Sequence, residues 1–201
     1  MRFSTLHHPL ITVTNALRPV QVLLPWVVAA TVLVGAESPR EIDDIPVPTT
    51  EVVEGQALPL RGADLLRWNW VVKIYVAACW LPLGTTDPVT ATPKRFAFTY
   101  RRAFRAEDLA KATAATIVAG HDEVVRTALA TPLAAWNAAY RDVTAGDRLT
   151  VDHLSDGTAI MALNGTELVR LTDPTFAKAL AAIWVGPHTF DEDLRTALTG
   201  G

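Results

Sequence analysis

The chain has 201 residues, of which half are hydrophobic and 19% are charged. This length and composition predict one domain with a packed core and exclude a mostly disordered chain. The formal net charge is −3, and the first 36 residues contain two arginines but no acidic residue, so the rest of the chain is more acidic still. An acidic domain without a basic run is a poor partner for nucleic acids and anionic membrane surfaces, and we expect neither.

The N-terminus has the pattern of a secretory signal peptide. Its arginines precede an uncharged stretch rich in Val, Leu and Ala, Val20 to Ala36, which ends in small residues before a charged, proline-containing sequence. We therefore expect residues 1–36 to be a signal peptide cleaved near Ala36, which leaves a periplasmic or secreted protein without a stable membrane span. The alternative is an uncleaved anchor, although 17 residues with Pro25 among them are near the short limit for a membrane-spanning helix.

Residues 37–50 mix charges with three prolines, and we expect a linker or extended arm there, followed by one domain over 51–201. Cys79 is the only cysteine, so an internal disulfide is impossible and core packing alone must hold the exported domain together. The apolar sequence around Cys79 indicates a buried thiol that acts as a small hydrophobic group.

Residues 68–81 have the clearest strand signal in the chain. Apolar residues occupy every second position, which predicts an extended segment with one face in the core. The members of that face are Trp68, Trp70, Val72, Ile74, Val76, Ala78 and Trp80. The other face is mixed: it carries Lys73 and Tyr75 and becomes apolar toward Cys79, and Pro82 ends the strand.

A second strand and two helices are predicted next. Aromatic residues alternate over 94–101, which is typical of a strand. An alanine-rich stretch over 107–119 predicts a helix that ends at Gly120. Thr131 as an N-cap, followed by Pro132 in the first turn, predicts the start of the second helix.

The last third of the chain predicts more strands and then more helices. Turn signals, of which Asn164-Gly165 is the strongest, divide 147–171 into a three-stranded meander. A helix follows from Asp173-Pro174 to Gly186, and a short one opens at 191–193, where acidic residues suit the helix dipole. The order of strands, helices, strands and helices predicts an α+β fold, with a large antiparallel sheet and a helical layer on one face.

Three segments resemble the chalcone isomerase-like superfamily, and in particular its bacterial exported members. They are Gly62 to Leu81, which ends VVKIYVAACWL; GDRLTV at 146–151 with ALNGTEL at 162–168; and FAKALAAIWVGP at 176–187 with DEDLRTAL at 191–198. The resemblance covers most of 51–200. It implies an open-faced β-sandwich, in which a large antiparallel sheet is covered by a helical layer, in agreement with the order of the predicted elements.

The resemblance also implies candidate site residues. Plant enzymes of the superfamily use an arginine, a threonine, and a helix tyrosine and asparagine, whereas its fatty-acid binders keep the arginine and have a tyrosine in place of the threonine. Here Arg67 matches the arginine and Tyr75 stands at the threonine position, as in the binders. When the helix is aligned on Lys111, Asp108 and Ala115 replace the tyrosine and asparagine. We therefore expect no chalcone isomerase activity.

A ligand site at Arg67, Lys73 and Tyr75 is physically plausible under one condition. Two residues apart on a strand, Lys73 and Tyr75 share a face and lie about 7 Å apart, next to apolar neighbours. Such a site suits a carboxylate with a hydrophobic tail, and Arg67 would add a bidentate contact. Arg67 and Tyr75 would be roughly 26 Å apart on a continuous strand, so a shared site needs a turn within 62–69.

The sequence leaves three functions open. The first is an exported protein that binds a small hydrophobic or fatty-acid-like carboxylate ligand. The second is an isomerase, an intramolecular lyase, acting on an unknown small substrate, with Tyr75 as proton donor and Arg67 as stabiliser of negative charge. The third is a structural or partner-binding role. No catalytic residue is assigned and no cofactor is expected; His121, His153 and His188 lack the short spacing of metal ligands, and the sequence leaves the oligomeric state open.

Overall fold

The computed structural model describes residues 40–200, so the predicted signal peptide at 1–36 lies outside the described residues. The strands are β1 (Arg40–Ile42), β2 (Ile45–Val47), β3 (Thr50–Val53), β4 (Gln56–Trp68), β5 (Val72–Trp80), β6 (Lys94–Tyr100), β7 (Arg148–His153), β8 (Thr158–Leu163) and β9 (Thr166–Thr172). The helices are α1 (Ala106–Ala119), α2 (Glu123–Ala139), α3 (Pro174–Val185) and α4 (Glu192–Thr199).

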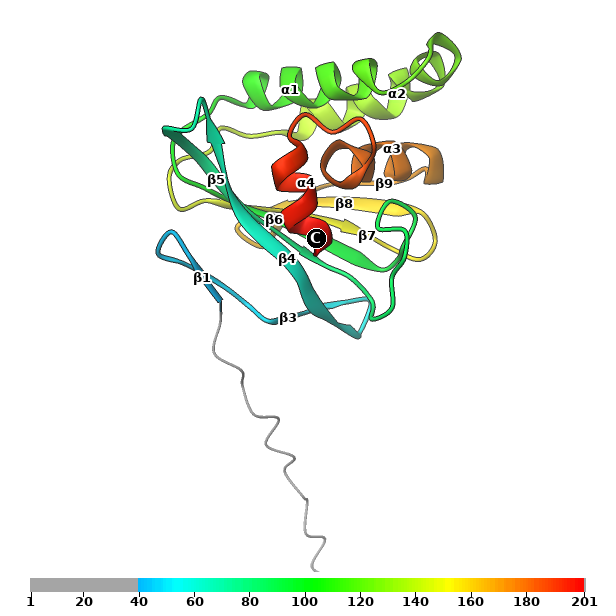
Figure 1. Cartoon of the computed structure of the whole chain (residues 1–201). Coiled ribbons are helices and arrows are strands. Elements are labelled where there is room, and N and C mark those ends of the chain that lie inside the picture. The colour runs from blue at the N-terminus through cyan, green and yellow to red at the C-terminus, as the bar shows by residue number, and fades with distance from the viewer. Residues whose placement is uncertain (1–39, 201) are drawn as a thin grey trace, which may run out of the picture. The chain divides into compact units, whose positions relative to one another are not determined.

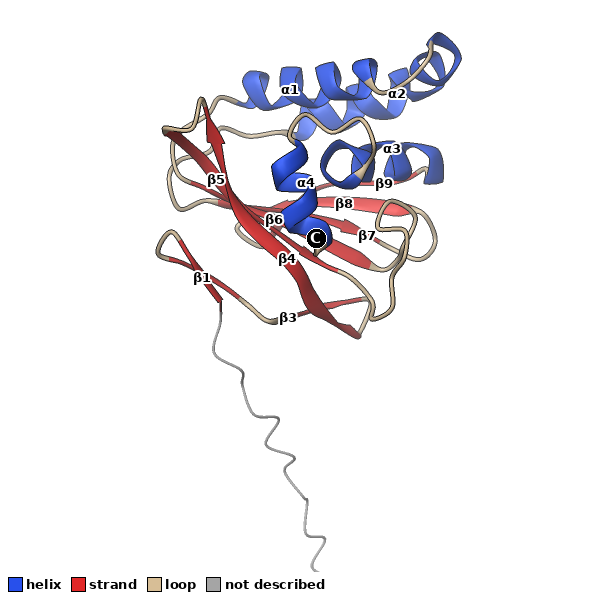
Figure 2. Cartoon of the chain, in the orientation of Figure 1, coloured by secondary structure: helices blue, strands red, loops and turns tan. Residues whose placement is uncertain are grey.

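Strands β3 to β9 form one antiparallel sheet in which each strand pairs with its neighbours in the sequence. The four helices lie on one face of this sheet, and the β1–β2 hairpin lies on the other (Figures 1 and 2). The predicted α+β fold is therefore confirmed. The stretch expected as an extended arm contains, from Arg40 on, this hairpin and the start of β3.

Both faces of the central strands are buried. On the helical side, β5 to β8 pack against α3, whose Phe176 and Leu180 are completely buried. On the other side, Val76 and Trp80 pack against Val47 of the β1–β2 hairpin, and the Trp80 indole nitrogen donates to the Pro48 carbonyl at 2.9 Å. Cys79 is fully buried, as expected from its apolar surroundings.

The helix predictions hold at three of four places. Helices α1, α3 and α4 lie where the caps and stops predicted them, and the Asp173 carboxylate accepts from the Phe176 amide at the start of α3. The predicted start at Thr131 is wrong, because α2 already begins at Glu123 and contains Pro132 in its interior. Asp122 is the true N-cap and accepts from the Val125 amide at 2.9 Å. None of the helices within 40–200 is long and apolar enough to cross a membrane.

The predicted strand over 68–81 is wrong at its start. Asn69, Trp70 and Val71 form the turn of the β4–β5 hairpin, and β5 begins only at Val72. Trp68 and Trp70 are 65% and 86% exposed instead of buried. The apolar alternation of the sequence runs on through this turn, where the backbone is no longer extended, so it does not place these side chains in the core. Asn69 and Trp70 have φ of 49° and 65°, a left-handed conformation that Asn tolerates but a bulky residue rarely adopts.

Replacing Trp70 by Gly is expected to stabilise the protein by about 0.5–1 kcal/mol, because Gly relieves the left-handed strain while an exposed side chain contributes little packing. Val71→Gly is the matched control: Val71 is 79% exposed in the same turn and has no positive φ, so this change is expected to destabilise. Urea denaturation of both variants measures the difference. Equal effects of the two changes would contradict strain at Trp70.

Candidate functional site

A cavity of about 450 Å³ lies between the sheet and the helices. Strands β4 to β7 contribute one wall, and α1 and α3 contribute the other. Its apolar lining residues are Leu66, Ile74, Phe98, Phe104, Leu109, Ala112, Ala115, Leu149, Ile183, Trp184 and Phe190. Its polar lining residues are Tyr75, Tyr100, Asp108, Thr113, Thr116 and Tyr140. We call this space the tyrosine cavity; its volume and mostly apolar wall are typical of small-molecule sites.

Tyr75 lies in the wall of the tyrosine cavity, as the sequence analysis expected. Its ring meets Phe98 and Tyr100 edge to face, with ring centroids 5.2 and 5.8 Å apart, so neighbouring aromatic rings fix its orientation. Burial raises the pKa of Tyr75 well above its ordinary value, and the Asp191 carboxylate acts in the same direction. The phenol is therefore a neutral hydrogen-bonding group at physiological pH.

Lys73 does not share a face with Tyr75, so that expectation is wrong. Leu66 pairs with Tyr75 and the next residue, Arg67, pairs with Lys73, which leaves Ile74 as the extra residue of a β-bulge. The bulge breaks the alternation: Ile74 lines the tyrosine cavity with Tyr75. The Lys73 amine instead forms an ion pair with Asp43 in the β1–β2 turn, on the opposite face of the sheet.

The β4–β5 pairing places Arg67 one residue beyond the partner of Tyr75, but Arg67 does not line the tyrosine cavity. The turn that begins at Asn69 reverses the chain between Arg67 and Tyr75, so the separation calculated for one continuous strand does not apply. Arg67 pairs with Lys73 across the hairpin, and both act on the same carboxylate: the Lys73 hydrogen bond, then the charges of Arg101 and Arg67, lower the pKa of Asp43. Asp43 thus pairs with Lys73 and Arg101, whereas Arg67 lines a separate pocket of about 400 Å³ together with Asp191 and Asp193.

The two helix positions named from the resemblance do line the tyrosine cavity. Asp108 and Ala115 both lie on the α1 wall. Both positions therefore border the cavity, but neither carries the tyrosine or asparagine of the plant enzymes that the resemblance implies.

A buried hydroxyl network on the helical side was missed in the sequence. The Trp136 indole nitrogen donates to the Tyr140 hydroxyl at 3.3 Å, and the Tyr140 and Thr113 oxygens are 2.8 Å apart. Burial raises the pKa of Tyr140, so its phenol stays neutral. Trp136 and Tyr140 are four residues apart, a helical spacing that predicts core packing. The indole N–H and the phenol O–H on this apolar face were the only indication in the sequence of a hydrogen-bonded network.

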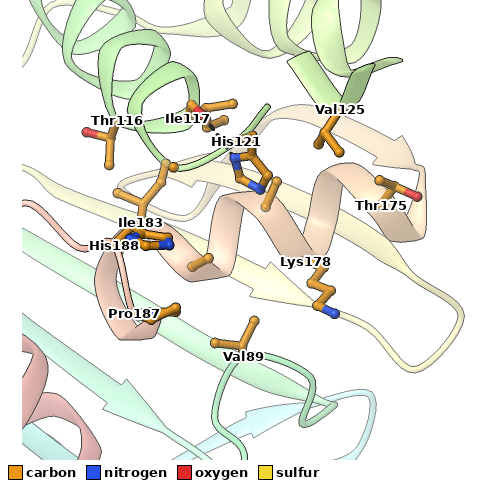
Figure 3. A pocket seen from close by; sticks show the side chains of 13 residues that line it. Val89, Thr116, Ile117, His121, Val125, Thr175, Lys178, Ile183, Pro187 and His188 are labelled. Carbon is orange, nitrogen blue, oxygen red and sulfur yellow. Dashed lines mark hydrogen bonds between the residues drawn. The ribbon is translucent and has the colours of Figure 1, made fainter. Parts of the chain in front are cut away.

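A second cavity of about 330 Å³ adjoins the first, since Thr116 and Ile183 line both (Figure 3). His121, from the α1–α2 connection, and His188, from the loop after α3, lie on its wall. The His121 Nδ1 atom is 2.9 Å from the Ile117 carbonyl and donates to it, because a carbonyl can only accept. Within the described part of the chain, no three His, Cys, Asp or Glu side chains cluster as metal ligands would.

Lys94 and His153 are also buried, but neither lines the tyrosine cavity or the second cavity. The Lys94 amine donates to the carbonyls of Pro88, Val89 and Ala91 at 3.1, 2.6 and 2.9 Å, and burial lowers its pKa to about 8. Burial, followed by the charge of Lys94, also holds the pKa of His153 well below its ordinary value. Lys94 therefore anchors the loop before β6.

Comparisons with known proteins agree with this architecture. A family model described as chalcone isomerase-like matches residues 39–200. No curated protein matches the sequence significantly. Among solved structures, the chain is similar to a fatty-acid binding protein of Arabidopsis thaliana, with a TM-score of 0.53, 7% sequence identity, and coverage of 75% of this chain and 96% of that one. At this identity the structural match supports the fold alone. Since the family model spans most of the chain, the protein belongs to the chalcone isomerase-like family.

Proposed function

We propose that the protein binds a small hydrophobic or fatty-acid-like ligand in the tyrosine cavity, with Tyr75 as a contact residue, and that it has no chalcone isomerase activity. The observation that carries this proposal is the cavity itself: about 450 Å³ with a mostly apolar wall and a few hydroxyl groups. The similar Arabidopsis thaliana structure is of a fatty-acid binding protein, which favours the same class of ligand.

Of the three residues named from the sequence, Tyr75 is the one that the proposal keeps in the binding wall. Arg67 and Lys73 act on Asp43, so we propose a supporting role for them at the base of the β4–β5 hairpin. We further propose, from the sequence of residues 1–36 alone, that the protein is exported to the periplasm or secreted after cleavage near Ala36.

Native mass spectrometry of the purified full chain, before and after delipidation, tests the binding function. We expect a co-purifying hydrophobic species and its return when lipid extract is added back. Ala112→Trp is expected to weaken ligand binding at least about tenfold, because the new indole occupies space in the cavity next to Ala112.

Ala119→Trp is the matched control for the cavity-filling variant. Ala119 is exposed on the same helix and does not line the tyrosine cavity, so its replacement should leave ligand binding unchanged. Equal binding by both variants, or a wild-type protein that takes up no hydrophobic species, would argue against the proposed function.

A further inference from the structure

We propose that the ligand of the tyrosine cavity is an uncharged amphiphile with a hydrogen-bond-accepting oxygen, such as a ketone, aldehyde or ester on a hydrocarbon chain, and not a free carboxylate. This inference rests on the proposed function and narrows its ligand class. It is carried by the kinds of polar atoms that line the cavity and by the hydroxyl pair of Thr113 and Tyr140 on its helical wall.

The charged residue that lines the cavity is acidic. Asp108 lies on its α1 wall, and the carboxylate of Asp191 acts electrostatically on the Tyr75 phenol. The other polar lining residues are three tyrosines and two threonines. A carboxylate placed here would lose its hydration, meet two like charges and gain only neutral donors, which is strongly disfavoured.

Three cations near the β4–β5 hairpin have acidic neighbours outside the lining of the cavity. Lys73, which the bulge at Ile74 turns away from Tyr75, forms an ion pair with Asp43, and Arg101 forms another with the same carboxylate. Arg67 lines a neighbouring pocket together with Asp191 and Asp193. These carboxylates therefore offset positive charge that would otherwise favour an anionic ligand.

The hydroxyl network leaves a donor for the ligand. Trp136 can only donate, so the Tyr140 oxygen accepts its hydrogen, and one of the Thr113 and Tyr140 hydroxyls donates to the other. The pair carries two hydrogens and uses one of them internally, and both residues line the cavity, so one hydrogen is left for a ligand. The neighbouring Thr116 differs, because its hydroxyl donates to the Ala112 carbonyl of its own helix at 3.0 Å. The Thr113–Tyr140 pair thus supplies a donor to an accepting oxygen.

Calorimetric titration of the delipidated full chain at pH 8 with 2-decanone, decanoate and decane tests the inference. These probes have the same chain length and differ in the polar group. We expect 2-decanone to bind at least about tenfold more tightly than decanoate, and also more tightly than decane. Thr113→Val combined with Tyr140→Phe removes both hydroxyls and is expected to weaken 2-decanone binding about fivefold more than it weakens decane binding. Thr127→Val is the control and should alter neither, because Thr127 is exposed on α2, does not line the cavity, and donates to the Glu123 carbonyl of its own helix.

The outcomes separate the two proposals. Decanoate binding as tightly as 2-decanone would overturn the ligand class while the binding function stands. Equal binding of 2-decanone and decane would also overturn it, because the accepting oxygen would then contribute nothing. If none of the three compounds binds, the proposed function itself fails and the inference fails with it.

Discussion

Replacing Lys94 by Met is expected to lower the free energy of unfolding by about 2 kcal/mol at pH 7. Lys94 is 1% exposed, and its amine serves three backbone carbonyls in the loop from Pro88 to Ala91. Met fills much of the same space but donates no hydrogen bond, so the variant leaves these partly buried carbonyls without the Lys94 donor. Thermal or chemical denaturation followed by circular dichroism measures the loss.

Lys178→Met is the control, because Lys178 is an exposed lysine of α3 near the same loop. Its replacement should change stability by less than about 0.5 kcal/mol. A Lys94→Met protein that is as stable as the control would show that the amine is not needed to hold the loop.

The loss in Lys94→Met is expected to grow as the pH rises above 8. Burial lowers the pKa of Lys94 from 10.5 to about 8 in the folded protein. Between these values the unfolded chain binds the proton and the folded chain does not, so the Lys94 contribution to stability increases with pH. The difference between wild type and variant should widen by up to about 3 kcal/mol between pH 8 and 10.5. A constant difference would contradict a depressed pKa.

Replacing Gly62 by Ala is expected to prevent stable packing of α4, at a cost above about 3 kcal/mol. A Cβ atom at Gly62 would lie 1.8 Å from the Ala197 carbonyl oxygen, and this oxygen belongs to the backbone of α4. Strand β4 and α4 therefore approach so closely that only a residue without a side chain fits between them. We expect a strongly lowered melting temperature and rapid proteolysis within 190–200.

Gly55→Ala separates this clash from the general effect of replacing a glycine. Gly55 has φ of 75° and no atom within 4 Å of an added Cβ, so only the left-handed backbone is penalised, by about 1–2 kcal/mol. If Gly62→Ala cost no more than Gly55→Ala, or if the 190–200 segment stayed resistant to protease, the close contact with α4 would be wrong.

Most of the fold was predictable from local patterns. The aromatic alternation of 94–101 is strand β6, and the turn signals of 147–171 divide β7, β8 and β9 as expected. These patterns succeed because each pairing in the sheet joins strands that are neighbours in the sequence, so local turns define the topology. The start of α2 was missed since Thr131-Pro132 has the chemistry of a helix start but lies inside a helix that begins at the Asp122 cap.

The candidate site was only partly predictable. Tyr75 was placed correctly because its cavity face follows from alternation toward Cys79. Lys73 was misplaced because a bulge depends on how two strands pair, and nothing in the order of residues 72–76 reveals it. Thr113 was missed because its partner Tyr140 is 27 positions away, and packing between α1 and the end of α2 brings them together.

The bulge at Ile74 also means that the charge around the tyrosine cavity depends on the length of β4. One additional residue in β4 between Leu66 and Arg67 would pair with Ile74 and restore regular alternation in β5. Lys73 and its cross-strand neighbour Arg67 would then rotate together toward Tyr75. If the proposed preference for neutral ligands holds, such an insertion is expected to shift it toward anions, because two cations would then lie near Tyr75.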